Sequence, residues 1–193
     1  MTVMTVRTKQ PGRRRRGFTL VESMATISVL GILGSSASFL ILDAVDDYID
    51  ASVSAQLHSE MSIALDRAMR EIRKIELDTT ASDVAPDITS MTDTLLQWED
   101  SSGNAYRLGW SGSELQLQIA GGTIATLLTD VTDMVISIFD EDNVDLGASC
   151  GGPGCDAVRR IAVEVWTQRS GVTESLRFKA FIRSTMSGAQ GEA

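Results

Sequence analysis

The feature that most constrains this chain is a stretch of 20 residues, 23–42, that carries no charged side chain. A helix of that length is long enough to cross the hydrocarbon core of a bilayer. Four consecutive arginines, Arg13 to Arg16, precede it, and basic residues next to a spanning helix are retained on the cytoplasmic side. The sequence therefore predicts one membrane-spanning helix, with the N-terminus in the cytoplasm and everything after Leu42 outside it.

One acidic residue, Glu22, lies near the start of the apolar segment that runs from Phe18 to Leu42. A carboxylate in an apolar helix costs roughly 2.5–3.5 kcal/mol at the membrane centre, and less near the end. Nothing within the helix neutralises it, because the arginines lie beyond Gly17. We expect Glu22 either to sit at the interface or to need an external cation, and an amino terminus created just before it would be a suitable one.

The same segment is rich in small and hydroxyl-bearing residues. Four of them recur at a spacing of three, four and three residues, which puts them on one face of a helix: Ser28, Gly31, Ser35 and Ser38. Small-residue stripes let helix backbones approach closely in membranes. The stripe favours a helix that packs against other helices over a weakly apolar anchor.

The helical pattern continues beyond the membrane segment, since no glycine or proline occurs from residue 35 to residue 85. Apolar residues recur every three or four positions, as expected for a helix with one buried face: Ile49, Val53, Leu57, Met61, Leu65, Ala68, Ile72 and Ile75. We expect one helix from about Phe18 to about Leu77. Two ion pairs are expected on its polar side, Asp66–Arg70 and Arg67–Glu71.

The run from Gly17 to Glu22, Gly-Phe-Thr-Leu-Val-Glu, resembles the processing motif of type IV prepilins and type II secretion pseudopilins. The resemblance implies that a prepilin peptidase cuts between Gly17 and Phe18 and methylates the new amino group of Phe18. It also implies that Glu22 pairs with the amino terminus of a neighbouring subunit during assembly. The expected fold is then pilin-like and α+β, with a long N-terminal helix packed against an antiparallel β-sheet.

The helix end at residues 65–73, Leu-Asp-Arg-Ala-Met-Arg-Glu-Ile-Arg, is similar to minor pilins and minor pseudopilins of the J or W type. Those are low-copy subunits that are thought to sit at the fibre tip. The resemblance implies other pilin or pseudopilin subunits and an inner membrane assembly platform as partners. It places the chain in the inner membrane as a single-pass protein before it joins a fibre.

The charge distribution argues against a nucleic-acid partner. Six of the 17 basic residues lie in residues 1–17, which leaves 11 basic against 26 acidic residues in the remainder. Phosphate binding needs clustered Lys and Arg instead. No signature of a nucleophile, a phosphate loop or a dinucleotide site occurs, and the single histidine, His58, is expected to be a helix-surface or packing residue. We expect no enzyme and no cofactor.

Two cysteines, Cys150 and Cys155, enclose a short Gly-Gly-Pro-Gly segment. In an exported domain this spacing favours a small disulfide loop, with free thiols as the alternative. The acidic residues Asp140, Asp142 and Asp145 precede it and are a weak candidate for calcium. Because the ordered ligand ladder and central glycine of an EF-hand are missing, a solvated acidic turn is favoured.

Alternating apolar residues bounded by turn signals fill the second half of the chain and predict an antiparallel meander of six or seven strands. The expected strands are residues 95–99, 105–110, 115–119, 123–128, 134–138, 158–169 and 172–182. Trp98, Trp110 and Trp166 are expected in core or cross-strand packing rather than on a ligand surface. Residues 79–94 are predicted to be a loop.

These patterns divide the chain into five segments. They are a cytoplasmic leader at 1–17, a transmembrane and assembly helix at 18–42, the soluble half of the helix at 43–78, a β domain at 79–183 and a flexible tail at 184–193. Two other readings remain. One is an exported periplasmic binding domain, with Arg15-Arg16 in a twin-arginine signal and a cut near Ser35-Ser36-Ala37. The other is a signal-anchored membrane protein that does not assemble.

Overall fold

The computed structural model describes residues 19–79, 81, 84–147, 149–183 and 185. The expected leader at 1–17, the expected cleavage site and nearly all of the expected tail lie outside these residues. The chain divides into two compact units, Met1–Asp47 and Tyr48–Ala193. Each unit is described by itself.

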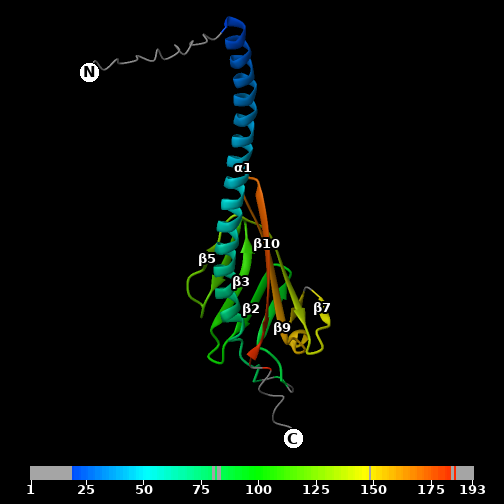
Figure 1. The fold of residues 1–193 in the computed structure, drawn as a ribbon. Helices are drawn as coiled ribbons and strands as arrows, with labels where there is room; N and C mark the ends of the chain where they lie inside the picture. The colour runs from blue at the N-terminus through cyan, green and yellow to red at the C-terminus, as the bar shows by residue number, and fades with distance from the viewer. Residues whose placement is uncertain (1–18, 80, 82–83, 148, 184, 186–193) are drawn as a thin grey trace, which may run out of the picture. The chain divides into compact units, whose positions relative to one another are not determined.

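Helix α1 spans Leu20–Ile72 (Figure 1). It begins after Thr19, whose Oγ1 accepts a hydrogen bond from the backbone N–H of Glu22 at 3.3 Å. This is the contact of a helix N-cap, which satisfies one of the donors left free in the first turn. Among the described residues of the first unit, the secondary structure is helix α1. Its large apolar side chains there are exposed.

In the second unit, the C-terminal part of α1 buries one face of the helix. Its buried residues follow the predicted three- and four-residue spacing: Leu57, Met61, Ala64, Leu65, Ala68, Met69 and Ile72. The predicted stripe is therefore confirmed from Leu57 onward. Its first predicted member, Ile49, is half exposed. Asp66 pairs with Arg70 as expected, whereas Glu71 pairs with Lys74 rather than with Arg67.

The expected helix end near Leu77 was wrong, because α1 ends at Ile72. The chain then becomes extended and pairs with a later segment. Leu77 forms an isolated antiparallel bridge with Pro86, and the backbone N–H of Asp87 donates to the carbonyl of Glu76 at 2.9 Å. These long-range hydrogen bonds outweigh the local helical tendency of the sequence.

The first sheet has six strands in the order β5-β4-β3-β2-β1-β8, and every neighbouring pair is antiparallel. Its strands are β1 (Ile88–Thr92), β2 (Leu95–Glu99), β3 (Ala105–Ser111), β4 (Glu114–Gln118), β5 (Ala125–Leu128) and β8 (Cys150–Gly151). The strands β2 to β5 form the predicted meander. Strand β1 lies in the segment that we expected to be a loop, and a register shift between Ile88 and Ser90 hides its alternation in the sequence.

The second sheet has four antiparallel strands in the order β10-β9-β6-β7. These are β6 (Val131–Phe139), β7 (Asp145–Gly147), β9 (Arg160–Arg169) and β10 (Val172–Phe181), and a short 3-10 helix, η1 (Gly152–Cys155), precedes β9. The long hairpin β9–β10 closes at Ser170 and Gly171, which both have positive φ angles. That conformation matches the twist of a two-residue hairpin turn.

The prediction of a single continuous meander was therefore wrong in one respect, because the chain passes from the first sheet to the second after β5. Asp130 adopts a φ of 60° at this point, a left-handed conformation that Asp tolerates better than most residues. Its carbonyl accepts a hydrogen bond from the N–H of Gln168 in β9 at 3.0 Å. Strand β6 then pairs with β9 and not with β5.

One hydrophobic core joins the buried face of α1 to both sheets. It contains α1 residues such as Leu65, first-sheet residues such as Leu108, and second-sheet residues such as Val163. Figure 1 shows the C-terminal part of α1 running along the strands of this domain. A long N-terminal helix packed against antiparallel sheets confirms the predicted α+β fold class.

Candidate functional site

The N-terminal part of α1 exposes a continuous series of large apolar side chains. They include Leu20, Val21, Ile27, Leu30, Ile32, Leu33, Phe39, Leu40, Ile41 and Leu42. Among the described residues, α1 is long and apolar enough to cross a membrane, and none of its most apolar window is buried. Single exposed apolar residues are common, but a long uncovered series marks a surface for lipid or for a protein partner.

The hydroxyl groups of this segment are satisfied within the helix itself. The donors bond to carbonyls three or four residues earlier: Ser23 to Thr19, Thr26 to Glu22, Ser28 to Met24, Ser35 to Ile32, Ser36 to Leu33 and Ser38 to Gly34. A polar group without a partner is costly in an apolar medium. These bonds lower that cost, so the serine-rich helix is compatible with lipid or with a packed helical core.

The small residues of the predicted stripe leave the helix surface open. A Cβ atom added at Gly31 or Gly34 would meet no other heavy atom within 4 Å. Ser28, Ser35 and Ser38 are likewise exposed. The described part of the chain therefore presents this face without a covering element.

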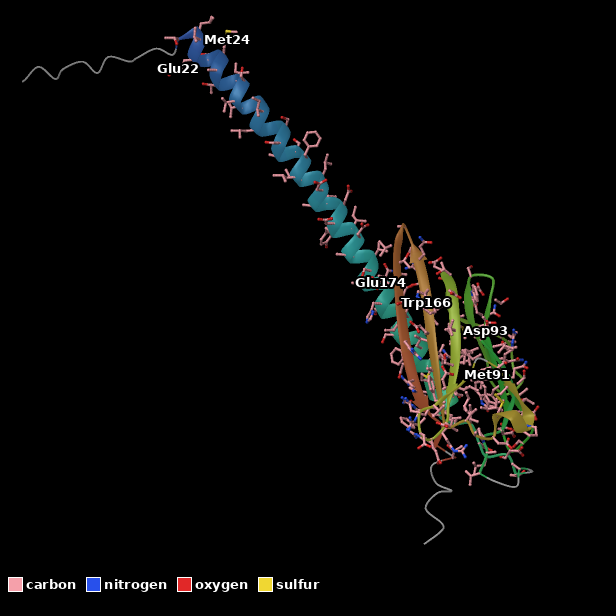
Figure 2. The ribbon with its side chains drawn as sticks, turned by 90° about the vertical axis from the view of Figure 1, so that its right-hand side faces the viewer. Glu22, Met24, Met91, Asp93, Trp166 and Glu174 are labelled. Atoms are coloured by element: carbon pink, nitrogen blue, oxygen red, sulfur yellow. A yellow bond between two sulfur atoms is a disulfide. The ribbon has the colours of Figure 1, made fainter. Side chains whose placement is uncertain are left out.

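Glu22 lies in the first turn of α1, with its side chain exposed. Figure 2 shows Glu22 and Met24 standing out from the start of the helix. No ion pair of Glu22 occurs among the described residues. The N-cap at Thr19 was missed in the sequence, although Thr-x-x-Glu at residues 19–22 matches the pattern of a capping box. The position near a helix N-terminus favours a negative charge through the helix dipole.

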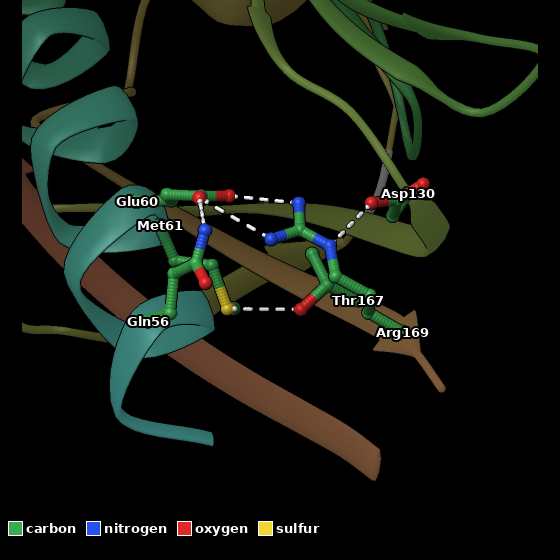
Figure 3. Close-up of polar contacts among 6 residues, drawn as sticks. All are labelled: Gln56, Glu60, Met61, Asp130, Thr167 and Arg169. Atoms are coloured by element: carbon green, nitrogen blue, oxygen red, sulfur yellow. Dashed lines mark hydrogen bonds and ion pairs between the residues drawn. The ribbon is translucent and has the colours of Figure 1, made fainter. Parts of the chain in front are cut away.

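A second polar cluster, in the other unit, fastens α1 to the sheets (Figure 3). The Arg169 guanidinium at the end of β9 donates to both carboxylate oxygens of Glu60, at 3.2 and 2.9 Å, and to Oδ2 of Asp130 at 2.8 Å. Next to it, the buried Thr167 hydroxyl donates to Sδ of Met61 at 3.2 Å. The sequence did not single out Arg169, because its partners lie far away in the chain.

The electrostatics of this cluster follow from its hydrogen bonds. The bonds from Arg169 and Gln56 hold the pKa of Glu60 below its usual value. The bonds to Glu60 and Asp130 raise the pKa of Arg169 above its ordinary value, so the guanidinium stays charged. The cluster stabilises the fold, because a permanently charged guanidinium between two carboxylates neither donates nor accepts protons near neutral pH.

Cys150 and Cys155 are joined by a disulfide bond. Cys155 is fully buried, and Cys150 pairs with Met91 across β8 and β1. The bond closes the short loop that contains η1 and keeps β8 at the edge of the first sheet.

The acidic segment that was weighed as a calcium candidate does not gather its carboxylates. Asp140 Oδ1 accepts from the N–H of Val144 at 2.7 Å, and Asp145 Oδ1 accepts from the N–H of Gly147 at 2.8 Å. Asp142 is exposed. In the described part of the chain, no three His, Cys, Asp or Glu side chains form a group that could hold a metal ion.

The tryptophans and the histidine take structural positions. Trp98 is buried and stacks on Tyr106, with ring centroids 5.4 Å apart. Trp110 and Trp166 are half-buried in strands β3 and β9, and Trp110 packs against the core. His58 is exposed on α1.

The long N-terminal helix and the antiparallel sheets that it packs against form a pilin-like architecture. Comparison with known proteins gives the same result. Residues 12–38 match a family model described as the prokaryotic N-terminal methylation motif. Fimbrial protein Q of Moraxella bovis is 31% identical to this chain over 115 residues, which is 58% of the chain and 63% of that protein.

The chain therefore spans less than two thirds of the length of this curated relative. The methylation motif and the fimbrial relative both support a type IV pilin-like family, in agreement with the resemblance that residues 17–22 carry. The same findings support a prepilin with an N-terminal methylation motif and a helix long and apolar enough to cross a membrane.

Proposed function

We propose that this chain is made as a membrane-inserted prepilin and matures into a minor subunit of a pilus-like fibre. One observation carries the proposal. The methylation motif covers residues 12–38, and these lead into a helix whose apolar side chains are uncovered among the described residues. A motif for processing thus coincides with a surface that needs lipid or other helices around it.

Maturation removes the leader at residues 1–17. A prepilin peptidase cuts between Gly17 and Phe18 and methylates the amino group of Phe18. The chain is held for this step by the inner membrane, with its leader in the cytoplasm and its β domain outside. Four arginines before the apolar segment support this orientation. An assembly platform in the same membrane then adds the subunit to the fibre.

Glu22 guides this addition. Its carboxylate is exposed in the first turn of α1, and the backbone N–H of Glu22 already donates to the Thr19 hydroxyl. In an apolar fibre core a carboxylate is costly without a partner. The methylated amino terminus of a neighbouring subunit supplies the cation, and the pair sets the register between the two helices.

The finer assignment is a minor pilin or pseudopilin of the J or W type, close to the fibre tip. It rests on the helix end at residues 65–73 and on the strand-rich domain that follows. The relative is named as a fimbrial protein, which favours a type IV pilus over a type II secretion pseudopilus as the fibre. Chromosomal neighbours that encode either machinery would decide between the two.

The intact mass and first residue of the native protein test the proposal. We expect a chain that begins at a methylated Phe18. A start near Ser38 would indicate an exported periplasmic domain, and an uncut Met1 would indicate a signal-anchored protein that does not assemble. Gly17→Val should block the cut, because a bulky residue replaces the glycine at the cleavage site, whereas Gly12→Val in the same leader should be processed normally.

The role of Glu22 has a separate test. Glu22→Ala should leave cleavage at Gly17 intact and reduce the amount of subunit in sheared fibres. Glu141→Ala removes an exposed carboxylate from a loop of the β domain and serves as the matched control. Equal amounts of both variants in fibres would show that Glu22 has no part in assembly.

A further inference from the structure

Strand β10 forms one edge of the second sheet and is much longer than the other edge strands of the described sheets. It has ten residues, whereas β5, β7 and β8 have four, three and two. Its pairing with β9 runs through ten residue pairs without a register shift, while the ladders of β5 and β7 each contain one. Short strands and bulges are common ways of protecting a sheet edge. Strand β10 has neither.

The hairpin turn determines which backbone groups of β10 point away from β9. Because the loop has two residues, Arg169 and Val172 form a hydrogen-bonded pair, and such pairs alternate with open pairs along an antiparallel ladder. The N–H of Ile182 donates to the carbonyl of Arg159 at 3.1 Å, which follows the same alternation. The outward-facing N–H and C=O groups therefore belong to Thr173, Ser175, Arg177, Lys179 and Phe181.

These outward-facing groups are accessible. None of them hydrogen-bonds to another segment among the described residues, and their five side chains are exposed. Helix α1 approaches the start of the strand, where the Ser54 hydroxyl donates to Oε1 of Glu174 at 2.5 Å. We therefore place the accessible edge after this contact, at residues 175–181. A row of unpaired backbone groups is a template for a further strand.

Two side chains give this edge a positive charge. Arg177 and Lys179 are exposed and alternate on the face that points away from the core. Arg177 has a loose ion pair with Glu164 at 3.8 Å. Lys179 lies 3.5 Å from the ring centre of Phe139 and donates to the amide oxygen of Asn143, and no ion pair of Lys179 occurs in the described part of the chain. Both cations can therefore accept a carboxylate.

A third cation lies next to these two. The Arg160 guanidinium on β9 is 4.6 Å from the ring centre of Phe181. Burial lowers the pKa of Lys179, the positive charges of Arg160 and Arg177 lower it further, and Asp145 opposes this change. Since like charges repel one another, a carboxylate placed beside Lys179 would relieve the repulsion.

The residues that alternate with these cations are apolar. Leu176 and Phe178 are half-buried and pack against the hydrophobic core. In a strand added beside β10, every second side chain would point to the same face as Leu176 and Phe178, and the others would lie beside Arg177 and Lys179. The edge thus fits a strand in which apolar and acidic residues alternate.

We propose that β10 accepts an extended segment of another protein, in which acidic and apolar residues alternate, as an additional strand of the second sheet. A second copy of β10 fits poorly, because an antiparallel pairing centred on residues 177–179 opposes cation to cation. The contact goes beyond the proposed function, since it concerns the β domain and needs no fibre.

Titration of the full-length protein with synthetic peptides, in a non-ionic detergent, tests the contact. The probe is Thr-Val-Glu-Val-Glu-Val-Thr. One control peptide has Lys in place of both Glu residues, and a second control, Thr-Val-Val-Glu-Glu-Val-Thr, has the same composition without the alternation. We expect the probe to bind at least about tenfold more tightly than either control, because only the probe places two carboxylates beside the two cations.

Amide exchange locates the bound peptide. Exchange should slow at Arg177 and Lys179, whose N–H groups acquire a partner. It should stay nearly unchanged at Leu176 and Phe178, whose N–H groups are already bonded to β9. Slower exchange at the second pair alone would overturn the proposed edge.

A proline variant tests the backbone contact. The N–H of Ser175 points away from β9, so Ser175→Pro removes a donor for the added strand and none of the hydrogen bonds of the hairpin. Ser175→Ala is the matched control, because it removes the hydroxyl group and keeps the N–H. We expect at least about tenfold weaker binding of the probe to the proline variant, and unchanged binding to the alanine variant. Wild-type affinity in the proline variant would overturn strand addition.

Charge reversal tests the choice of partner and does not depend on how the proline variant folds. Arg177→Glu with Lys179→Glu should reverse the preference, so that the lysine peptide binds more tightly than the probe. A preference that the reversal leaves unchanged would overturn the acidic partner. So would a wild-type protein that dimerises through β10, or one that binds no probe at about 1 mM peptide.

Discussion

Nη2 of Arg169 lies 2.9 Å from Oε2 of Glu60, although the two residues are 109 positions apart in the chain. The same guanidinium donates from Nε to Asp130 at 2.8 Å (Figure 3). One side chain at the end of β9 thus holds helix α1 and the turn between β5 and β6 together. The cluster therefore ties together three segments of the second unit that are far apart in the chain.

Replacing Arg169 should weaken that attachment. Arg169→Gln removes the bonds to Glu60 and Asp130, and we expect the free energy of unfolding to fall by about 1 kcal/mol, because the pairs are partly exposed. Arg177→Gln is the control, since its ion pair with Glu164 spans 3.8 Å and is looser. Urea unfolding of the purified proteins in detergent measures both. Equal losses of unfolding free energy in the two variants would show that the Arg169 cluster stabilises the fold no more than the looser Arg177 pair.

The same cluster should make stability depend on pH. Because Arg169 and Gln56 lower the pKa of Glu60 from 4.5, the folded chain favours the ionised carboxylate. This contribution is present above the unfolded pKa and is lost as the pH falls through the folded value. The difference in unfolding free energy between the wild-type chain and Glu60→Gln should therefore shrink below about pH 4. A constant difference between about pH 3 and pH 7 would contradict the assigned cause.

Asp87 should behave in the opposite way. Partial burial raises its pKa above 3.8, and the carboxylates of Asp78, Glu99 and Glu76 raise it further. Ionisation of Asp87 then costs the folded state free energy, and the cost appears as the pH rises from the unfolded to the folded pKa. Asp87→Asn should stabilise the protein by about 0.5 kcal/mol at neutral pH and not at about pH 3. Thermal unfolding at both pH values measures this.

The packing of α1 gives a sharper contrast. Leu65 is fully buried, whereas Ile63, two residues away on the same helix, is 70% exposed. Leu65→Ala should cost about 2–5 kcal/mol, because it removes buried apolar surface and leaves a cavity. Ile63→Ala should change the stability of the isolated subunit by less than about 0.5 kcal/mol. Chemical unfolding checks both, and similar losses would contradict the described helix face.

The disulfide should matter locally. Cys150→Ser with Cys155→Ser removes a short closed loop, for which the chain-entropy estimate is about 2 kcal/mol. We expect that loss in unfolding free energy, together with faster amide exchange at Met91, the β1 partner of Cys150. Exchange should stay unchanged at Val163, in the centre of the other sheet. Uniform acceleration at both sites would indicate that the bond stabilises the whole domain.

Much of the architecture was predictable because it is encoded in local periodicity. Alternation along residues 95–99 and 134–138 correctly placed strands β2 and β6, and the apolar spacing from Leu57 to Ile72 predicted the buried face of α1. Strand β1 was not predicted, because its register shift breaks the alternation of apolar residues. Strands β7 and β8 are only three and two residues long, too short to leave a pattern.

Some residues of the candidate site could likewise be predicted from local sequence, and others could not. Glu22 and the residues around it were visible in the sequence because a charge beside 20 uncharged residues is a local anomaly. The cluster of Arg169, Glu60 and Asp130 was not, because no spacing in the chain predicts which distant carboxylates a guanidinium meets. The N-cap of Thr19 was encoded in four residues and was overlooked.

The sequence by itself determined the resemblance of this chain to prepilins. A basic segment, a glycine before an aromatic residue, a glutamate and an apolar helix follow one another within 30 residues, and each acts through its immediate neighbours. Only the tertiary structure decided that the strands form two sheets, that the helix ends at Ile72 and that Arg169 holds it. Those outcomes depend on hydrogen bonds and contacts between segments far apart in the chain, whose free energies local patterns do not contain.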